Sequence, residues 1–159
     1  MHHPFHIDLR SLPEDGKDIA GTEEPSFFAL PEGDPVQAIS PLNYQLHLEK
    51  DAGDVVVTGR LEAAFRLECG RCLEPFEHRL VIEGYLAEIP IETNGTINLT
   101  DTIREDTLVA LPSYPRCEDG NVRPRQCPAE GKFEPAPEMP ADEAENAGRG
   151  VWDALNQLN

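Results

Sequence analysis

The chain has 159 residues, enough for one domain with a modest core, and its 39% hydrophobic content is typical of a globular protein with some unstructured segments. Its 30 acidic residues outnumber 13 basic ones, and the net charge of −17 disfavours a protein that binds nucleic acid through clustered Lys and Arg. No apolar run is long enough to cross a membrane and no signal-peptide pattern opens the chain, so we expect a cytoplasmic protein.

The acidity also bears on partners. A basic protein partner fits this charge, because opposite potentials steer two proteins toward each other. The alternative is that the charge only keeps the protein soluble.

Short-period alternation predicts most of the regular structure. Phe5, Ile7 and Leu9 alternate with polar residues, which is typical of a short strand. Residues 11–41 are rich in Pro, Gly and acidic side chains, and we expect a loop there with at most one short strand or turn. Residues 43–50 and 55–68 predict a hairpin joined by a turn at 51–54.

The stretch 55–68 is the strongest element of the sequence. Its apolar positions fall on one face of a strand and its polar positions on the other. The predicted buried face consists of Val55, Val57, Gly59, Leu61, Ala63, Phe65 and Leu67. The strand is longer than most, and Gly59 in its interior is a candidate for a bulge or a bend. We therefore expect a curled sheet or a partly open barrel.

A second β-rich run covers 78–89, but its apolar residues occur in both phases, so its register stays open. Asn94-Gly95 predicts a tight turn. After this turn the spacing of apolar residues changes from that of a strand to that of a helix. Thr102 and Glu105 form a capping-box pattern, which predicts the start of the helix. The helix that follows is expected to end at Pro112. Its packed side is predicted to consist of Ile103, Thr107, Leu108 and Leu111.

These elements predict an α+β, mainly β fold: an antiparallel curled sheet or partly open barrel with one packed helix. Residues 1–128 form the predicted domain that carries the cysteines. Residues 129–148, rich in Pro, Ala and Glu, are expected to be a linker, and 149–159 a short amphipathic helix. Trp152 in that helix is expected either to dock on the domain or to bind a partner.

Four cysteines are the candidate functional residues: Cys69, Cys72, Cys117 and Cys127. In a reducing compartment, cysteines favour metal binding or redox chemistry over disulfides. The CxxC spacing of the first pair provides two zinc ligands from one turn, whereas nine residues separate the second pair. His78 and His47 are reserve ligands. The alternatives are structurally idle cysteines and a redox pair, which Arg71 between the first two thiols would favour by stabilising a thiolate.

No other catalytic arrangement is recognisable, so we expect no enzyme and no small-molecule substrate. The alternative is a cytosolic thiol-redox or RNA-processing enzyme that uses the CxxC turn. That alternative lacks the helix N-terminus that activates a redox CxxC, because Leu-Glu-Pro follows Cys72.

Two stretches resemble the YceD family, the large ribosomal RNA subunit accumulation proteins. They are GRLEAAFRLECGRCLEPF at 59–76 and IREDTLVALPSYPRC at 103–117. Cys127-Pro128 and the terminal GVWDALNQL are similar to later family segments, so the resemblance runs from about residue 40 onward. Many members of the family carry a fuller second cysteine cluster, whereas this chain has two later thiols.

The resemblance implies a bacterial, non-enzymatic factor in ribosome biogenesis that supports the accumulation or processing of large-subunit ribosomal RNA. The resemblance implies that the four cysteines are metal ligands, and it implies no catalytic residue. Together with the acidity, it predicts a basic ribosomal protein or assembly factor as the partner, with ribosomal RNA reached indirectly.

Overall fold

A computed structural model describes residues 3–92 and 95–130. Its strands are β1 (His6–Asp8), β2 (Lys17–Glu23), β3 (Gln37–Ala38), β4 (Leu42–Asp51), β5 (Asp54–Glu68), β6 (Pro75–Pro90) and β7 (Thr96–Asn98). Its helical elements are α1 (Thr100–Val109) and the 3-10 turns η1 (Leu9–Ser11), η2 (Pro25–Phe28) and η3 (Cys117–Asp119). The predicted terminal helix, and the predicted linker beyond its first two residues, lie outside the described residues.

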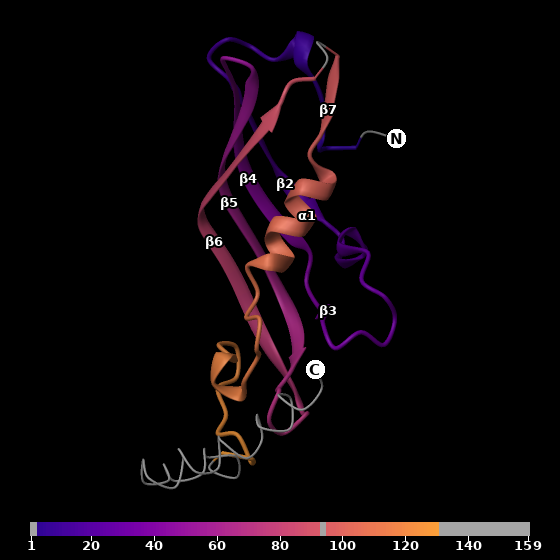
Figure 1. The fold of residues 1–159 in the computed structure, drawn as a ribbon, viewed down its shortest axis with the longest axis vertical. Coiled ribbons are helices and arrows are strands. Elements are labelled where there is room, and N and C mark those ends of the chain that lie inside the picture. The colour runs from indigo at the N-terminus through magenta and orange to yellow at the C-terminus, as the bar shows by residue number, and fades with distance from the viewer. Residues whose placement is uncertain (1–2, 93–94, 131–159) are drawn as a thin grey trace, which may run out of the picture. The chain divides into compact units, whose positions relative to one another are not determined.

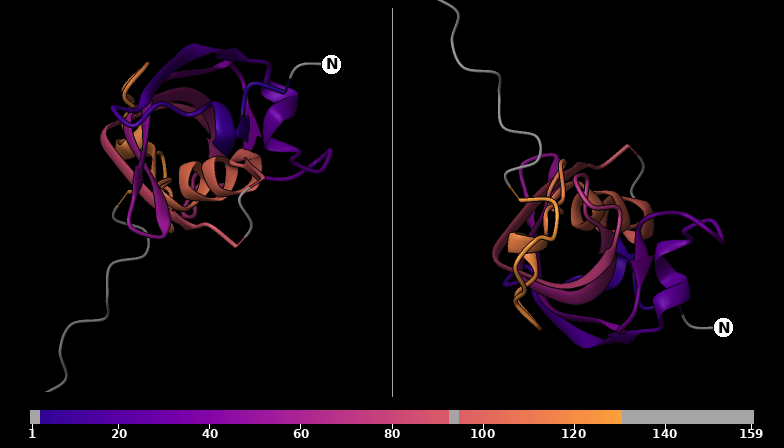
Figure 2. Two further views of the ribbon diagram at one scale, coloured as in Figure 1. Left: turned by 90° about the horizontal axis from the view of Figure 1, so that it is seen from above. Right: turned by 90° about the horizontal axis from the view of Figure 1, so that it is seen from below.

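The strands form two antiparallel sheets (Figure 1). In the larger sheet β6 pairs with one edge of β5, β4 and β3 pair with the other edge, and β2 pairs with β4. β1 and β7 form a separate two-stranded sheet. Seen end-on, the larger sheet curls around the interior without closing into a barrel, and α1 lies on its open side (Figure 2). The predicted mainly β, α+β fold is confirmed.

The hairpin of β4 and β5 turns where the sequence predicts it. Asp51 pairs with Asp54, and only Ala52 and Gly53 lie between the two strands. Ala52 adopts a left-handed conformation with φ of 54°. The predicted buried face of β5 is also confirmed, because its apolar side chains from Val55 to Leu67 are at most 1% exposed.

Gly59 marks the bend that allows β5 to curl. Its φ of 149° is unfavourable for other residues, and a Cβ there would lie 2.0 Å from the carbonyl oxygen of Gln45 on β4. The pairing with β6 shifts at the same place, since Gly59 pairs with Tyr85 and Leu61 with Ile82. The extra residue of this β-bulge therefore lies on β6, at Glu83 and Gly84.

The bulge explains why the register of β6 was open in the sequence. Before it, the buried side chains are Phe76 and Leu80, at even positions. After it, the buried side chain is Tyr85, at an odd position. One extra residue exchanges the two faces of a strand, so the apolar residues of β6 occur in both phases.

α1 is fixed to the sheet by polar contacts around an apolar core. The phenol of Tyr85 donates a hydrogen bond of 2.7 Å to Asp106, and burial raises the pKa of Tyr85. Arg104 donates to the carbonyl of Phe27 at 2.7 Å, and its guanidinium lies over the Phe27 ring. The helix thus joins η2 to β6 across the core, where Ile103 is 1% exposed.

The predicted start of the helix is wrong by three residues, because the N-cap is Leu99 and not Thr102. α1 begins at Thr100, so Thr102 and Glu105 lie inside the helix and form no capping box. Instead, the side chain of Asn98 accepts a hydrogen bond from the Thr100 backbone at 3.0 Å. The helix ends at Val109, so it stops before Pro112 as predicted but does not include Leu111, which the sequence placed on its packed side.

The segment 11–41 contains more structure than its composition indicates. β2 pairs along seven residues with β4, and β3 adds a two-residue pairing with β5. The side chains of β2 are exposed or half-buried on both faces, so no alternation marks it in the sequence. Tertiary pairing at a sheet edge, and not its own pattern, makes this segment a strand.

We predict that Gly59→Ala destabilises the protein by about 3 kcal/mol, because the new Cβ meets backbone and the φ is strained. Gly84→Ala is the matched control in the same bulge, since a Cβ there meets nothing within 4 Å. It should change stability by no more than about 0.5 kcal/mol. Chemical denaturation of both variants measures the difference, and equal losses would contradict a specific bend at Gly59.

We predict that Asp18→Asn lowers the pKa of His47. The Asp18 carboxylate lies 2.7 Å from Nδ1 of His47 and raises that pKa above its ordinary value, with a smaller contribution from Glu49. A raised folded-state pKa stabilises the fold below the unfolded pKa of about 6.5, and the gain is lost as pH rises through the folded pKa. NMR titration of the His47 ring measures the shift. Glu49→Gln should lower the pKa less than Asp18→Asn does.

Candidate metal centre

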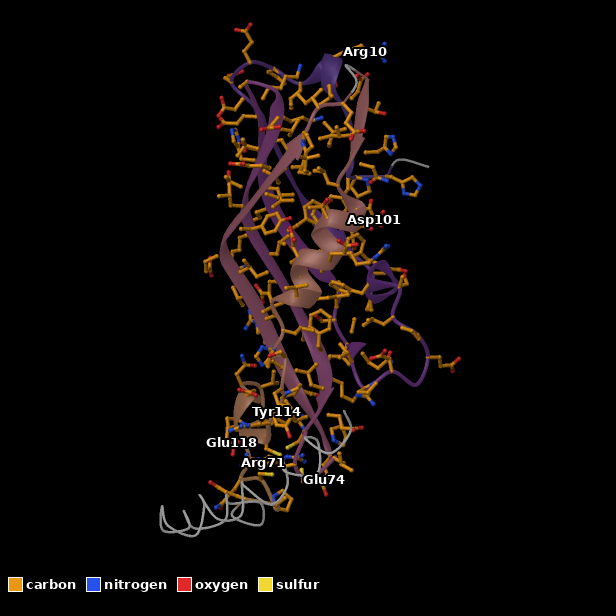
Figure 3. All side chains as sticks on the ribbon, in the orientation of Figure 1. Arg10, Arg71, Glu74, Asp101, Tyr114 and Glu118 are labelled. Carbon is orange, nitrogen blue, oxygen red and sulfur yellow. The ribbon has the colours of Figure 1, made fainter. Side chains whose placement is uncertain are left out.

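Four cysteines, two from the CxxC turn and two from residues 117–127, meet at the end of the β5–β6 hairpin where Figure 3 labels Arg71, Glu74 and Glu118. Cys69 directly follows β5, and Cys72 lies on the turn into β6. Cys117 begins η3, and Cys127 lies in the loop beyond it. Their sulfur atoms all lie within 4.8 Å of one another. The structure therefore brings together all four residues that the sequence singles out.

The turn from β5 to β6 places the first two thiols. The Cys69 backbone N–H donates to the Glu74 carbonyl at 3.0 Å, and the Leu73 N–H donates to the Cys69 carbonyl at 2.9 Å. Leu73 has a φ of 61°, a conformation that costs a non-glycine residue on the order of 1 kcal/mol. These bonds close the turn tightly enough for Glu68 and Pro75 to remain paired in the sheet.

The loop that carries the second pair is fastened to this hairpin by hydrogen bonds. The Gly70 N–H donates to the Pro115 carbonyl at 2.8 Å. Asn121 behaves like a paired strand residue, because its side chain accepts from the Arg79 N–H at 2.7 Å and donates to the Arg79 carbonyl at 2.8 Å. These contacts hold the loop of Cys117 and Cys127 beside the CxxC turn.

The two reserve histidines do not join the cluster. His78 Nδ1 lies 2.7 Å from the Asp119 carbonyl and so helps to hold the cysteine loop. His47 lies on β4 and contacts Asp18. Among the described residues, the four cysteines form the group that is arranged to hold a metal ion.

Two of the six sulfur–sulfur distances in the cluster match the edges of a tetrahedral thiolate site. Cys69 and Cys127 have sulfur atoms 3.8 Å apart, and those of Cys72 and Cys117 are 3.6 Å apart. A tetrahedron with metal–sulfur bonds of about 2.3 Å has edges of about 3.8 Å. A disulfide needs sulfur atoms about 2.05 Å apart, and none of the four cysteines is in a disulfide. The donor set thus suits a thiolate-bound metal ion.

Backbone donors prepare one thiol for this role. Burial alone would raise the pKa of Cys69, but the backbone N–H groups of Cys72, Arg71 and Cys117 donate to its sulfur and lower its pKa to about 6. Burial raises the pKa of Cys117 to about 12, and Arg125 partly opposes this effect. Cys69 is 0% exposed, so its thiolate faces the other sulfur atoms and not solvent.

Two arginines supply positive charge around the sulfur atoms. Arg125 lies 3.4 Å from the sulfur of Cys117 and 4.0 Å from that of Cys72, and it pairs with Glu74 at 3.1 Å. Arg71 pairs with Glu118, which raises the pKa of Arg71. A dication bound by four thiolates keeps two negative charges, and the two guanidinium groups offset them only in part, because each is also paired with a glutamate. The glutamates in turn fix the arginines, as outer partners fix ligands in metal sites.

Arg125 and Asn121 were missed by the sequence reasoning. Arg125 stands two positions before Cys127, and that proximity was the available signal. The sequence contains no signal for the role of Asn121, because that role depends on the backbone of β6 lying alongside the loop.

A scan against protein-family models, a search of curated proteins and a search of solved structures each returned no match. In the part of the chain that the structure describes, no helix has the length and apolar character of a membrane span.

Proposed function

We propose that this chain is a non-enzymatic accessory protein of ribosome biogenesis, which supports the accumulation of large-subunit ribosomal RNA through a basic protein partner. We further propose that Cys69, Cys72, Cys117 and Cys127 hold a structural zinc ion. The observation that supports both is the convergence of the four cysteines, because the stretches that resemble the YceD family are the ones that meet in space.

Zinc suits this donor set better than harder ions do, because thiolates are its usual ligands in structural sites. Four protein ligands complete a tetrahedron and leave no position for substrate. The ion would supply a cross-link among β5, the CxxC turn and the loop around η3. The protein's own residues do the rest: the backbone donors favour the thiolate of Cys69, and Arg71 and Arg125 offset the negative charge.

The charge supports a basic protein as the direct partner. With a net charge of −17, the chain repels RNA phosphates and attracts Lys- and Arg-rich surfaces. Such surfaces are common on proteins that bind RNA, which accounts for an effect on ribosomal RNA without direct contact.

We predict that the purified protein contains about one zinc ion per chain and that Cys72→Ser removes it. Loss of a ligand should lower the free energy of unfolding by about 4 kcal/mol or more, because binding energy at such sites contributes to folding. Elemental analysis and thermal melting with and without a chelator measure both effects. Val122→Ser, at a 45% exposed position of the same loop, is the control and should change neither.

Two results of that experiment would contradict structural zinc. Metal-free protein whose Cys72→Ser variant melts like the parent would indicate idle cysteines. Thiol–disulfide exchange activity that is lost in a Cys72→Ser variant of unchanged stability would indicate the redox alternative.

We predict that deleting the gene in its own host lowers the ratio of large to small ribosomal subunits in sucrose gradients. The wild-type chain and Val122→Ser should restore the ratio, whereas Cys72→Ser should not, because it loses the metal clamp. An unchanged ratio in the deletion strain would refute the role in ribosome biogenesis. A tagged chain that recovers ribosomal RNA but no basic protein would refute only the proposed partner.

A further inference from the structure

An apolar groove lies between the C-terminal end of α1 and the loop that precedes β3. It has a volume of about 410 Å³. Its apolar lining comes from both sides, with Leu67 of β5 between them: Leu30, Val36, Leu67, Leu108, Val109 and Leu111. Val109 is 83% exposed, the highest value among the exposed large apolar side chains of the described residues.

The charge beside this groove is acidic. Among the described residues that line the groove, Asp34 is the charged one, and none of them is Lys or Arg. One oxygen of Asp34 accepts the Val36 N–H at 2.8 Å, which fixes this carboxylate in the lining of the groove. Glu105 precedes Val109 by one helical turn, so both lie on the same exposed side of α1.

The geometry points to a Lys- or Arg-rich amphipathic protein segment as the occupant. We propose that its apolar side chains fill the groove beside Val109 and that its basic side chains pair with Asp34 and Glu105. An apolar groove with an acidic rim matches the two faces of such a segment. This deepens the proposed function, on whose basic partner it rests, by locating the contact.

A second copy of the chain fits this surface poorly. A symmetric dimer through the groove would place its acidic rim against an identical rim, between two molecules that each carry a net charge of −17. RNA would meet the same repulsion.

The test uses the full chain with labelled Leu and Val methyl groups and a synthetic probe. The probe is a helical peptide with Leu at every third or fourth position and Lys elsewhere, and its counterpart carries Glu in place of Lys. We expect the Lys peptide to shift the methyl signals of Leu108, Val109 and Leu111, with an affinity that falls as salt rises. The Glu peptide should not bind.

Matched variants separate groove binding from general attraction to an acidic protein. Val109→Glu should weaken binding of the Lys peptide about tenfold, whereas Leu86→Glu, at a 61% exposed position on β6, should leave it within about twofold. Asp34→Asn combined with Glu105→Gln should weaken binding about threefold in low salt and have no effect in high salt.

Equal effects of Val109→Glu and Leu86→Glu, or shifts mapped to another surface, would overturn the proposed site. So would concentration-dependent dimers that Val109→Glu abolishes, because they would make a second copy the occupant.

The peptide test does not depend on ribosomes. Groove binding with normal subunit ratios in the deletion strain would leave the site standing and refute the proposed function. If the deletion strain has an abnormal subunit ratio and a Val109→Glu chain fully restores it, the groove is not the partner contact, and the proposed function stands.

Discussion

The close approach of Gly59 to the backbone of β4 is the constraint on which the larger sheet depends. β5 is paired on both edges, so any bend in it must be shared by β4 and β6. Gly59 allows the bend on the β4 side because it has no Cβ to meet the Gln45 carbonyl. On the other side, the bulge at Glu83 and Gly84 provides the extra backbone. The sheet can therefore curl around the core and still present the CxxC turn at its end.

The strands with one buried face were predictable because their apolar and polar residues alternate along the sequence. β4 and β5 follow from alternation alone, and the bend at Gly59 follows from a glycine in a long strand, whereas the register of β6 does not follow because its bulge puts apolar residues in both phases. β2 was not predictable, because an edge strand with no buried face leaves no alternation. The helix start was misplaced because Asn98, a side chain outside the helix, satisfies the first turn in place of the Thr102 pattern.

The cysteine site shows the same division between local and tertiary information. The CxxC turn follows from four consecutive residues, and its position at the end of a strand follows from the strand's pattern. That Cys117 and Cys127 meet this turn depends on Asn121 and Gly70, whose hydrogen bonds join segments about 40 residues apart in sequence. The charge balance through Arg71 and Arg125 becomes evident only once that contact exists.

The order of the cysteines along the chain has a consequence for synthesis. Cys127 follows α1 and all the strands of the described residues, so the fourth thiol leaves the ribosome only after these elements have been made. Chains that grow from the N-terminus begin to fold as they emerge, so the sheet and α1 can assemble before the thiol set is complete. A metal ion bound at the four-cysteine site would therefore bind late in synthesis, to a domain whose described strands and helix have already been made.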